Sequence, residues 1–247
     1  KPSSPKAKLT LEDGKSIDIE VSQESVILAD SLVKIENKGN MLVYSSEKME
    51  KVAYNTLSIP LGAEYCVMLP DNTKVFLNSG SELRYPVAFN NNSREVFLQG
   101  EAYFEVQKDS TKEFIVHTDQ MKIRVLGTSF NVKAYPDESN VQTTLLQGKV
   151  VVFVGENKKE KVEIRPSQQA EWDRGRVKLQ VREVDPDLFV AWKNGHFIFR
   201  QDRLEDIMRA LARWYDMEVI YLDASIKDMA FAGKLDRSED ITPILNV

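Results

Sequence analysis

Short apolar segments separated by turn residues dominate the first three quarters of the chain. Between residues 55 and 181, stretches rich in Val, Ile, Phe, Tyr and Thr are broken at regular intervals by Gly, Asn, Asp and Pro. Residues 121–125 alternate between apolar and polar, which is typical of a strand with one buried side. No helix-period segment of useful length interrupts this region. The pattern predicts an all-β domain, built as a two-layer sandwich or as a solenoid-like stack of strands.

One sequence pattern occurs twice within this region. A strand-like apolar segment, a Gln-Gly pair and a second strand-like segment follow one another, with the pair at Gln99-Gly100 in the first copy and at Gln147-Gly148 in the second. Between the two copies, Gly127 interrupts another strand-like segment. A glycine inside a strand pattern indicates a bulge or a close approach of another backbone, which is what we expect at Gly127.

The first 55 residues continue the β pattern after a linker-like start. Residues 1–8 read as a linker, and residues 9–19 predict a hairpin with Asp13-Gly14 at its turn, because this pair tolerates positive φ angles. A similar phrase recurs at residues 69–77, with Asp71 at the turn. A calcium loop needs alternating acidic ligands, which are absent, so both segments are predicted to be plain turns.

The pattern changes after residue 183, where a small α+β domain is predicted. Asp185 can cap a short helix that begins at Pro186, and Gly195 ends the segment that follows. A long helix with one apolar stripe comes next, and Asp202 and Glu205 have the spacing of a capping box. Strands are expected at residues 196–199, 217–221 and 229–235, and a second helix at 240–245. The sequence stops soon afterwards, so this domain of residues 184–247 is expected to be truncated.

Composition and charge exclude several classes of function. The formal net charge of −5 argues against a nucleic-acid partner, since phosphate binding requires clustered Lys and Arg. The single cysteine, Cys66, excludes an intrachain disulfide and a multi-cysteine zinc site. It lies in an apolar run, so an inert buried thiol is expected. No run is apolar enough to cross a bilayer and no signal peptide is visible, and we expect the sequence to be part of a longer protein.

A search for chemistry finds no catalytic, cofactor or metal site. His117 and His196 are the only histidines and stand apart from each other, and no nucleophile or phosphate-loop motif is present. Glu101 and Glu105 flank Tyr103 on one strand, but about 13 Å separates such positions, too far for a glycosidase pair. Both are expected to face solvent. Carboxylates of different strands could still converge, which leaves a hydrolase as a minor alternative.

Five motifs in order resemble the FecR family of iron-dicitrate-type anti-sigma regulators. Gly-Glu-Ala-Tyr-Phe-Glu-Val at 100–106 and Val-Leu-Gly-Thr-Ser-Phe-Asn-Val at 125–132 are the longest of them. The remaining motifs lie at residues 69–81, 114–118 and 146–150. Residues 191–195 and 211–215 resemble the companion C-terminal domain of Bacteroidetes members, which is similar to the short secretin/TonB signalling domain.

The resemblance implies the periplasmic region of a single-pass inner-membrane protein. Family members receive a signal from the N-terminal signalling domain of a TonB-dependent outer-membrane transporter. They relay it to an extracytoplasmic-function sigma factor through a cytoplasmic segment that has no counterpart in this sequence. The expected protein is not an enzyme and uses no cofactor or metal.

An exposed strand edge in the C-terminal domain is the predicted docking site, because strand addition provides affinity through backbone hydrogen bonds. We assign this edge to Met229, Phe231 and Gly233, with Arg213 and Trp214 beside it. Core packing remains an alternative role for Phe231. The alternative function is a carbohydrate-binding module of a glycan-uptake system, with Trp192, Trp214 and Tyr215 as its platform.

Overall fold

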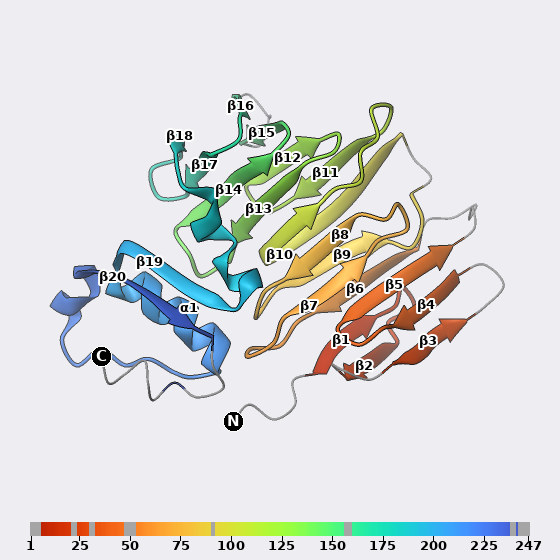
Figure 1. Cartoon of the computed structure of the whole chain (residues 1–247), viewed down its shortest axis with the longest axis horizontal. Helices are drawn as coiled ribbons and strands as arrows, with labels where there is room; N and C mark the ends of the chain where they lie inside the picture. The colour runs from red at the N-terminus through yellow and green to blue at the C-terminus, as the bar shows by residue number, and fades with distance from the viewer. Residues whose placement is uncertain are drawn as a thin grey trace.

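The computed structural model describes residues 6–20, 24–29, 33–46, 53–89, 92–155, 160–237 and 241. Strands fill most of it, and the only α-helix of this described part lies near the C-terminal end (Figure 1). We call the region up to β18 the β domain. Its strands are β1 (Lys6–Thr10), β2 (Ser16–Glu20), β3 (Ser25–Ala29), β4 (Val33–Asn37), β5 (Met41–Ser46), β6 (Tyr54–Ser58), β7 (Tyr65–Met68), β8 (Lys74–Leu77), β9 (Glu82–Pro86), β10 (Ser93–Glu105), β11 (Glu113–His117), β12 (Met121–Val125), β13 (Ser129–Ala134), β14 (Asn140–Gln147), β15 (Val150–Val154), β16 (Glu160–Ile164), β17 (Gln168–Asp173) and β18 (Lys178–Glu183).

Two sheets form the β domain and share the long strand β10. The first sheet has the order β2-β1-β6-β9-β10-β11-β12-β15-β16, and the second has the order β3-β4-β5-β7-β8-β10-β13-β14-β17-β18. β10 pairs through residues 93–99 in the first sheet and through residues 100–105 in the second. The pairs β10–β11 and β5–β7 are parallel, and the others are antiparallel.

A single apolar core lies between the two sheets. Val96 and Leu98, in the first half of β10, and Ala102 and Phe104, in its second half, are all at most 5% exposed and belong to the same buried cluster. This shared core is the arrangement of a sandwich, and it confirms the prediction of a mainly β fold. The alternation expected at residues 121–125 is also present, since Met121, Ile123 and Val125 of β12 are the buried positions.

The structure confirms the two predicted turns and the close backbone approach at Gly127, but the first strand begins earlier than predicted. Asp13-Gly14 closes the β1–β2 hairpin, and the Asp71 carboxylate accepts from the Thr73 backbone N–H at the next such turn. A Cβ added to Gly127 would lie 2.6 Å from Cα of Lys108, so Gly127 marks a close backbone approach. β1 already begins at Lys6, so residues 6–8 are strand rather than linker.

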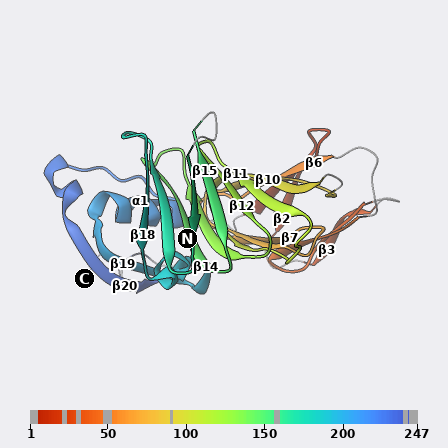
Figure 2. The same cartoon turned by 90° about the horizontal axis from the view of Figure 1, so that it is seen from above.

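Two short 3-10 helices follow the β domain and lead to a separate small unit. η1 (Pro186–Phe189) starts at the Asp185 cap as predicted, and η2 (Ala191–Asn194) ends at Gly195 in the left-handed conformation. We call residues 196–237 the C-terminal unit. It contains β19 (His196–Arg203), α1 (Leu204–Tyr215), η3 (Ala224–Asp228) and β20 (Ala230–Asp236). The unit lies at one end of the β domain, away from β3 (Figure 2).

The C-terminal unit differs from the sequence prediction in two respects. The capping box is wrong: Arg203 precedes α1, no side chain caps the helix, and the Asp202 carboxylate accepts from the Arg200 backbone N–H. The expected strand at residues 217–221 is also wrong, because none of the described strands pairs with this segment. The helix expected at 240–245 lies, apart from residue 241, outside the described residues.

Candidate docking site and interdomain junction

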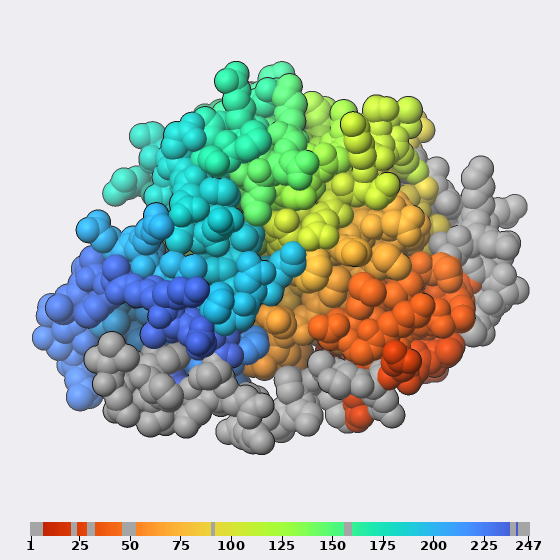
Figure 3. Space-filling model, viewed as in Figure 1, coloured from red at the N-terminus to blue at the C-terminus, as the bar shows by residue number. Residues whose placement is uncertain are grey.

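The exposed edge of the C-terminal unit is strand β20. It pairs with β19 on one side, and no other strand within the described residues pairs with it. Met229, just before β20, is 52% exposed and Phe231 is 45% exposed. The dark blue residues of this strand lie on the molecular surface in Figure 3. An unpaired edge of this kind can accept a further strand, so Met229, Phe231 and Gly233 lie where a partner can reach them.

The β19–β20 pair is irregular in the middle. The register shifts between Phe199 and Asp202, and Gln201 within this bulge has a φ of 57°. Gly233 pairs with Phe199 at the edge of the bulge, and Phe231 pairs with Asp202 on its other side. A bulge bends a strand pair and increases its local twist. Gly233 therefore lies at a bend of the predicted docking strand.

Arg213 faces the β domain from the last turn of α1. Its guanidinium is 2.7 Å from the Glu138 carboxylate and 2.8 Å from that of Asp137. The same group stacks over the Tyr135 ring at 3.7 Å. The Arg213 carbonyl accepts from the Gly62 backbone N–H at 2.9 Å. The predicted docking residue Arg213 is thus placed in the junction between the two parts of the chain, not beside β20.

Trp214 also turns inward, where it packs on Arg237. Arg237 directly follows β20, and its side chain is only 2% exposed. It donates to the Asn78 side chain at 2.8 Å, to the Trp192 carbonyl at 2.9 Å and to the Glu64 carboxylate at 3.1 Å. The Trp214 ring lies 3.6 Å from the guanidinium carbon. One arginine therefore joins the end of β20 to the β domain.

A buried polar network on β10 continues from Arg237 into the β domain. Glu101 is 8% exposed and accepts from the Asn78 amide at 2.8 Å and the Asn131 amide at 2.9 Å. The Trp192 indole N–H donates to Asn131 at 3.3 Å. The expectation that Glu101 faces solvent is wrong, because η2 and Arg237 cover this face of the sheet. Its two amide donors supply the hydrogen bonds that a buried carboxylate requires.

Lys193 of η2 adds a contact to the same sheet face. Its ammonium is 3.1 Å from the Glu105 carboxylate, and it lies 4.4 Å from the Phe76 ring and 4.5 Å from the Tyr103 ring. Glu105 is partly exposed and has this ion pair as its partner. η2 is therefore held on the β domain both by charge and by packing on aromatic rings.

Burial works against both charges of the Arg237–Glu64 pair. The loss of water raises the pKa of Glu64 above its ordinary value, although the charge of Arg237 opposes the rise. Burial likewise lowers the pKa of Arg237 against the attraction of Glu64. Desolvation thus exceeds the attraction for each partner, although only the Arg237 side chain is buried and the Glu64 side chain is 42% exposed. The pair holds a position without being a large source of stability.

Sequence reasoning named Arg213, Trp192 and Trp214 for other roles. It missed the junction residues Asn78, Asn131 and Arg237. Asn131 carried a usable signal, because Asn is unfavourable in the interior of a strand and its presence there indicates a specific hydrogen bond. Asn78 read as part of a turn, and Arg237 followed a strand without any motif. Trp192 is 7% exposed, and Arg237 packs on the partly buried ring of Trp214, so these two residues do not form the open platform expected for carbohydrate binding.

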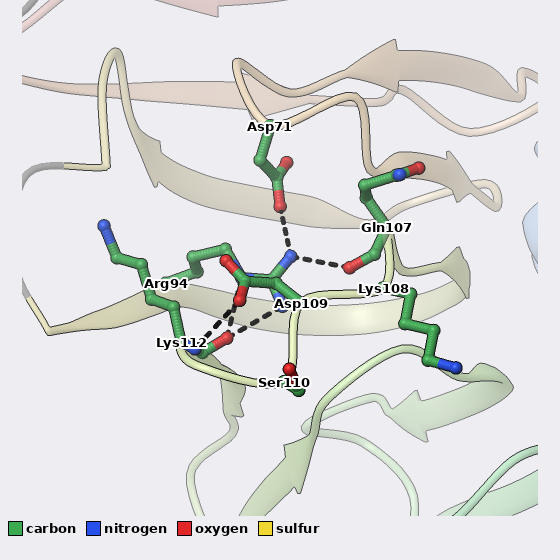
Figure 4. Close-up of a pocket in the computed structure, with 7 residues that line it drawn as sticks. All are labelled: Asp71, Arg94, Gln107, Lys108, Asp109, Ser110 and Lys112. Atoms are coloured by element: carbon green, nitrogen blue, oxygen red, sulfur yellow. Dashed lines mark hydrogen bonds and ion pairs between the residues drawn. The ribbon is translucent and has the colours of Figure 1, made fainter.

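A hollow of about 520 Å³ lies beside Arg94 of β10, which is one of its lining residues (Figure 4). The Arg94 side chain is 2% exposed and lies 2.7 Å from the Asp71 carboxylate. It also donates to the backbone carbonyls of Gln107 and Lys112, at 2.8 and 2.9 Å. All three nitrogens of the guanidinium are thereby engaged, since Nε donates to Lys112 as well. Arg94 fixes the loop after β10 and is not available to a ligand.

The remaining candidate chemistry is accounted for by local contacts. His117 lies 2.9 Å from Glu95, and His196 lies 2.9 Å from Asp236. Burial raises the pKa of the Cys66 thiol to about 12. No cluster of three or more His, Cys, Asp or Glu in the described part of the chain could hold a metal ion. Among the helices described, none is long and apolar enough to span a membrane.

Comparison with known proteins identifies the family. Residues 55–151 match the family described as FecR protein, and residues 196–247 match the one described as FecR, C-terminal. Two crystal structures of a candidate anti-sigma factor from Parabacteroides distasonis are similar to this chain. The structure at 1.65 Å resolution is 31% identical over 77% of this chain and 88% of that one, with a TM-score of 0.72. The structure at 2.50 Å resolution is 32% identical over 78% of this chain and 89% of that one, also with a TM-score of 0.72.

No curated protein matches the chain. The chain is therefore a member of the FecR family of anti-sigma factors.

Proposed function

We propose that this chain is the periplasmic sensor region of a transmembrane anti-sigma factor. It receives a signal from the N-terminal signalling domain of a TonB-dependent outer-membrane transporter. A cytoplasmic segment then relays the signal to an extracytoplasmic-function sigma factor. Membership of the FecR family supports the regulatory role, and the separate match of residues 196–247 supports a distinct C-terminal unit as the docking part.

The observation that carries the docking step is the open edge of β20. Its backbone N–H and C=O groups on one side have no strand partner among the described residues, and Phe231 and Met229 stand exposed beside them. Strand addition satisfies such groups, and side chains at alternate positions provide selectivity. The partner therefore presents an extended segment with apolar side chains that meet Met229 and Phe231.

A titration tests this proposal. Signalling domains of the TonB-dependent transporters of the source organism are titrated into the wild-type chain by calorimetry, alongside the variants Phe231→Asp and Met229→Asp. A charge in the centre of a docked apolar edge removes a hot-spot contact, which costs about 2 kcal/mol or about 30-fold in Kd. Leu222→Asp is the matched control, because Leu222 is fully exposed and lies outside β20.

Two outcomes would contradict the proposal. The first is that no transporter signalling domain binds the wild-type chain at concentrations up to about 1 mM, the weak end of specific association. The second is that Phe231→Asp and Leu222→Asp reduce the affinity equally. A direct glycan ligand is not proposed, because Trp192 and Trp214 are engaged in the junction.

A further inference from the structure

The junction between the C-terminal unit and the β domain is made of charged contacts rather than apolar packing. The unit has its own small core around Phe197, Ile207 and Leu211, which is separate from the core of the β domain. Arg213 and Arg237 supply the ion pairs across the boundary. Polar interfaces of this kind are typical of domains that move relative to each other.

The attachment of η1 and η2 is different in character. Val190 and Trp192 form an apolar cluster with Tyr103 of β10, so this segment belongs to the surface of the β domain. Gly195, in the left-handed conformation with a φ of 77°, follows η2 directly and precedes β19. Gly195 therefore separates two kinds of attachment to the β domain. The segment before it packs through apolar contacts, and the C-terminal unit after it is attached through ion pairs of Arg213 and Arg237.

The geometry of β20 links its exposed edge to one of these arginines. Two-stranded ribbons twist more strongly than wider sheets, so the addition of a third strand reduces the twist of the β19–β20 pair. The bulge next to the Phe199–Gly233 pair is the place where such a change is absorbed. Gly233 and Arg237 are four residues apart, about 13 Å along a strand. A rotation of about 10° at Gly233, well within the range of strand twist, therefore moves Arg237 by about 2 Å.

A displacement of that size breaks the hydrogen bonds of Arg237, which are 2.8 to 3.1 Å long. We propose that Arg237 is the positioning residue that couples the docking edge to the β domain: strand addition at β20 withdraws Arg237 and releases the C-terminal unit. The docking step rests on the function proposed above. The role of Arg237 in holding the two parts together does not depend on any partner.

The first experiment needs no partner. Arg237→Met keeps an unbranched side chain about as long as the arginine stem and removes the guanidinium with its charge. Trp192 and Trp214 at the junction report its state through intrinsic fluorescence. We expect the emission of Arg237→Met to lie at longer wavelength than that of the wild-type chain, because release of the C-terminal unit exposes the Trp214 ring, which packs on Arg237, to water. Arg176→Met is the control, because Arg176 is 79% exposed at the β17–β18 turn. An Arg237→Met spectrum identical to that of the control overturns the positioning role.

Separation of the two parts is measured by energy transfer between two labels. Cys66 is replaced by Ala, and cysteines at Gln120 of the β domain and Glu218 of the C-terminal unit, both exposed, carry the dyes. Loss of transfer in the Arg237→Met background, with circular dichroism unchanged, shows release of the unit rather than unfolding. Unchanged transfer overturns the proposal.

The second experiment uses the transporter signalling domain that binds. Docking is expected to lower the energy transfer of the labelled wild-type chain, and Arg237→Met is expected to bind at least about fivefold more tightly, since the cost of release has been removed. Equal affinities together with unchanged transfer overturn the inference while the proposed function stands. Absence of binding by both proteins refutes the proposed function and the docking step with it.

Discussion

Substitution of Gly100 tests whether the exchange of β10 between the two sheets depends on a residue without a side chain. Gly100 has a φ of +103°, in a region that L-residues rarely adopt. An added Cβ would lie 2.5 Å from the Ser81 Oγ and 2.7 Å from the Ser81 Cα. The Ser81 hydroxyl cannot turn away without loss, because it accepts from the Glu101 backbone N–H at 2.8 Å and donates to the Glu101 carbonyl at 3.0 Å.

The cost of Gly100→Ala has two parts. The left-handed conformation costs about 1–2 kcal/mol for a residue with a Cβ. Overpacking of a tight contact adds about 1–3 kcal/mol, because the start of β9 has to move away from β10. The variant is therefore expected to lose about 2–5 kcal/mol of unfolding free energy. Urea unfolding followed by circular dichroism and tryptophan fluorescence measures this as a lower midpoint with an unchanged slope.

Gly14→Ala separates the two contributions. Gly14 has a φ of +84°, but nothing lies within 4 Å of an added Cβ, so this variant carries only the conformational cost of about 1–2 kcal/mol. The difference between the two variants isolates the contact with Ser81. If Gly100→Ala unfolds at the same urea concentration as Gly14→Ala, the close approach at the sheet exchange is not the reason for glycine at position 100.

Two further predictions concern buried polar groups. Because burial raises the Cys66 pKa from 9.0 to about 12, the thiol should resist Ellman's reagent at pH 8 until urea is added. The same shift means that the folded state favours the neutral thiol, so the free energy of unfolding should fall as the pH rises from about 9 to 12. Urea unfolding at each pH measures this decrease, which should be less steep in Cys66→Ala. Arg94→Met removes a buried guanidinium that bonds with Asp71 and with the Gln107 and Lys112 carbonyls, and it should cost about 3–5 kcal/mol in urea unfolding. Arg176→Met should cost under about 1 kcal/mol. A near-zero cost for Arg94→Met, or rapid labelling of native Cys66, would refute these assignments.

The β architecture could be predicted from sequence because strand signals are local. The Asp13-Gly14 turn and the alternation around Ile123 depend on residues close together in the chain, and both appear in the structure. The capping box at Asp202 failed because β19 continues directly into α1 and leaves Arg203 at the cap position. A segment such as 217–221 shows strand-like alternation in its sequence, but a strand also needs a neighbour, which local pattern does not reveal.

The junction was harder to predict because its contacts span the whole chain. Arg237 bonds with Glu64, 173 positions earlier, and Trp192 bonds with Asn131. Alternation shows that Glu101 shares a strand face with Tyr103, but it does not show that a later segment covers that face. The exposed position of Phe231 could be predicted from the sequence, because the prediction needed only a local apolar strand at the edge of a small sheet.

The 13-residue strand β10 has a consequence for how the β domain folds. Because one continuous strand is paired in both sheets, a slip of one residue would shift the pairing of both sheets together and turn every core side chain of β10 outward. Neither sheet can therefore open locally without disturbing the other. In native-state hydrogen exchange, the amides of β10 on both sides of Gly100 are expected to exchange together, at the rate of global unfolding and more slowly than those of the edge strand β18.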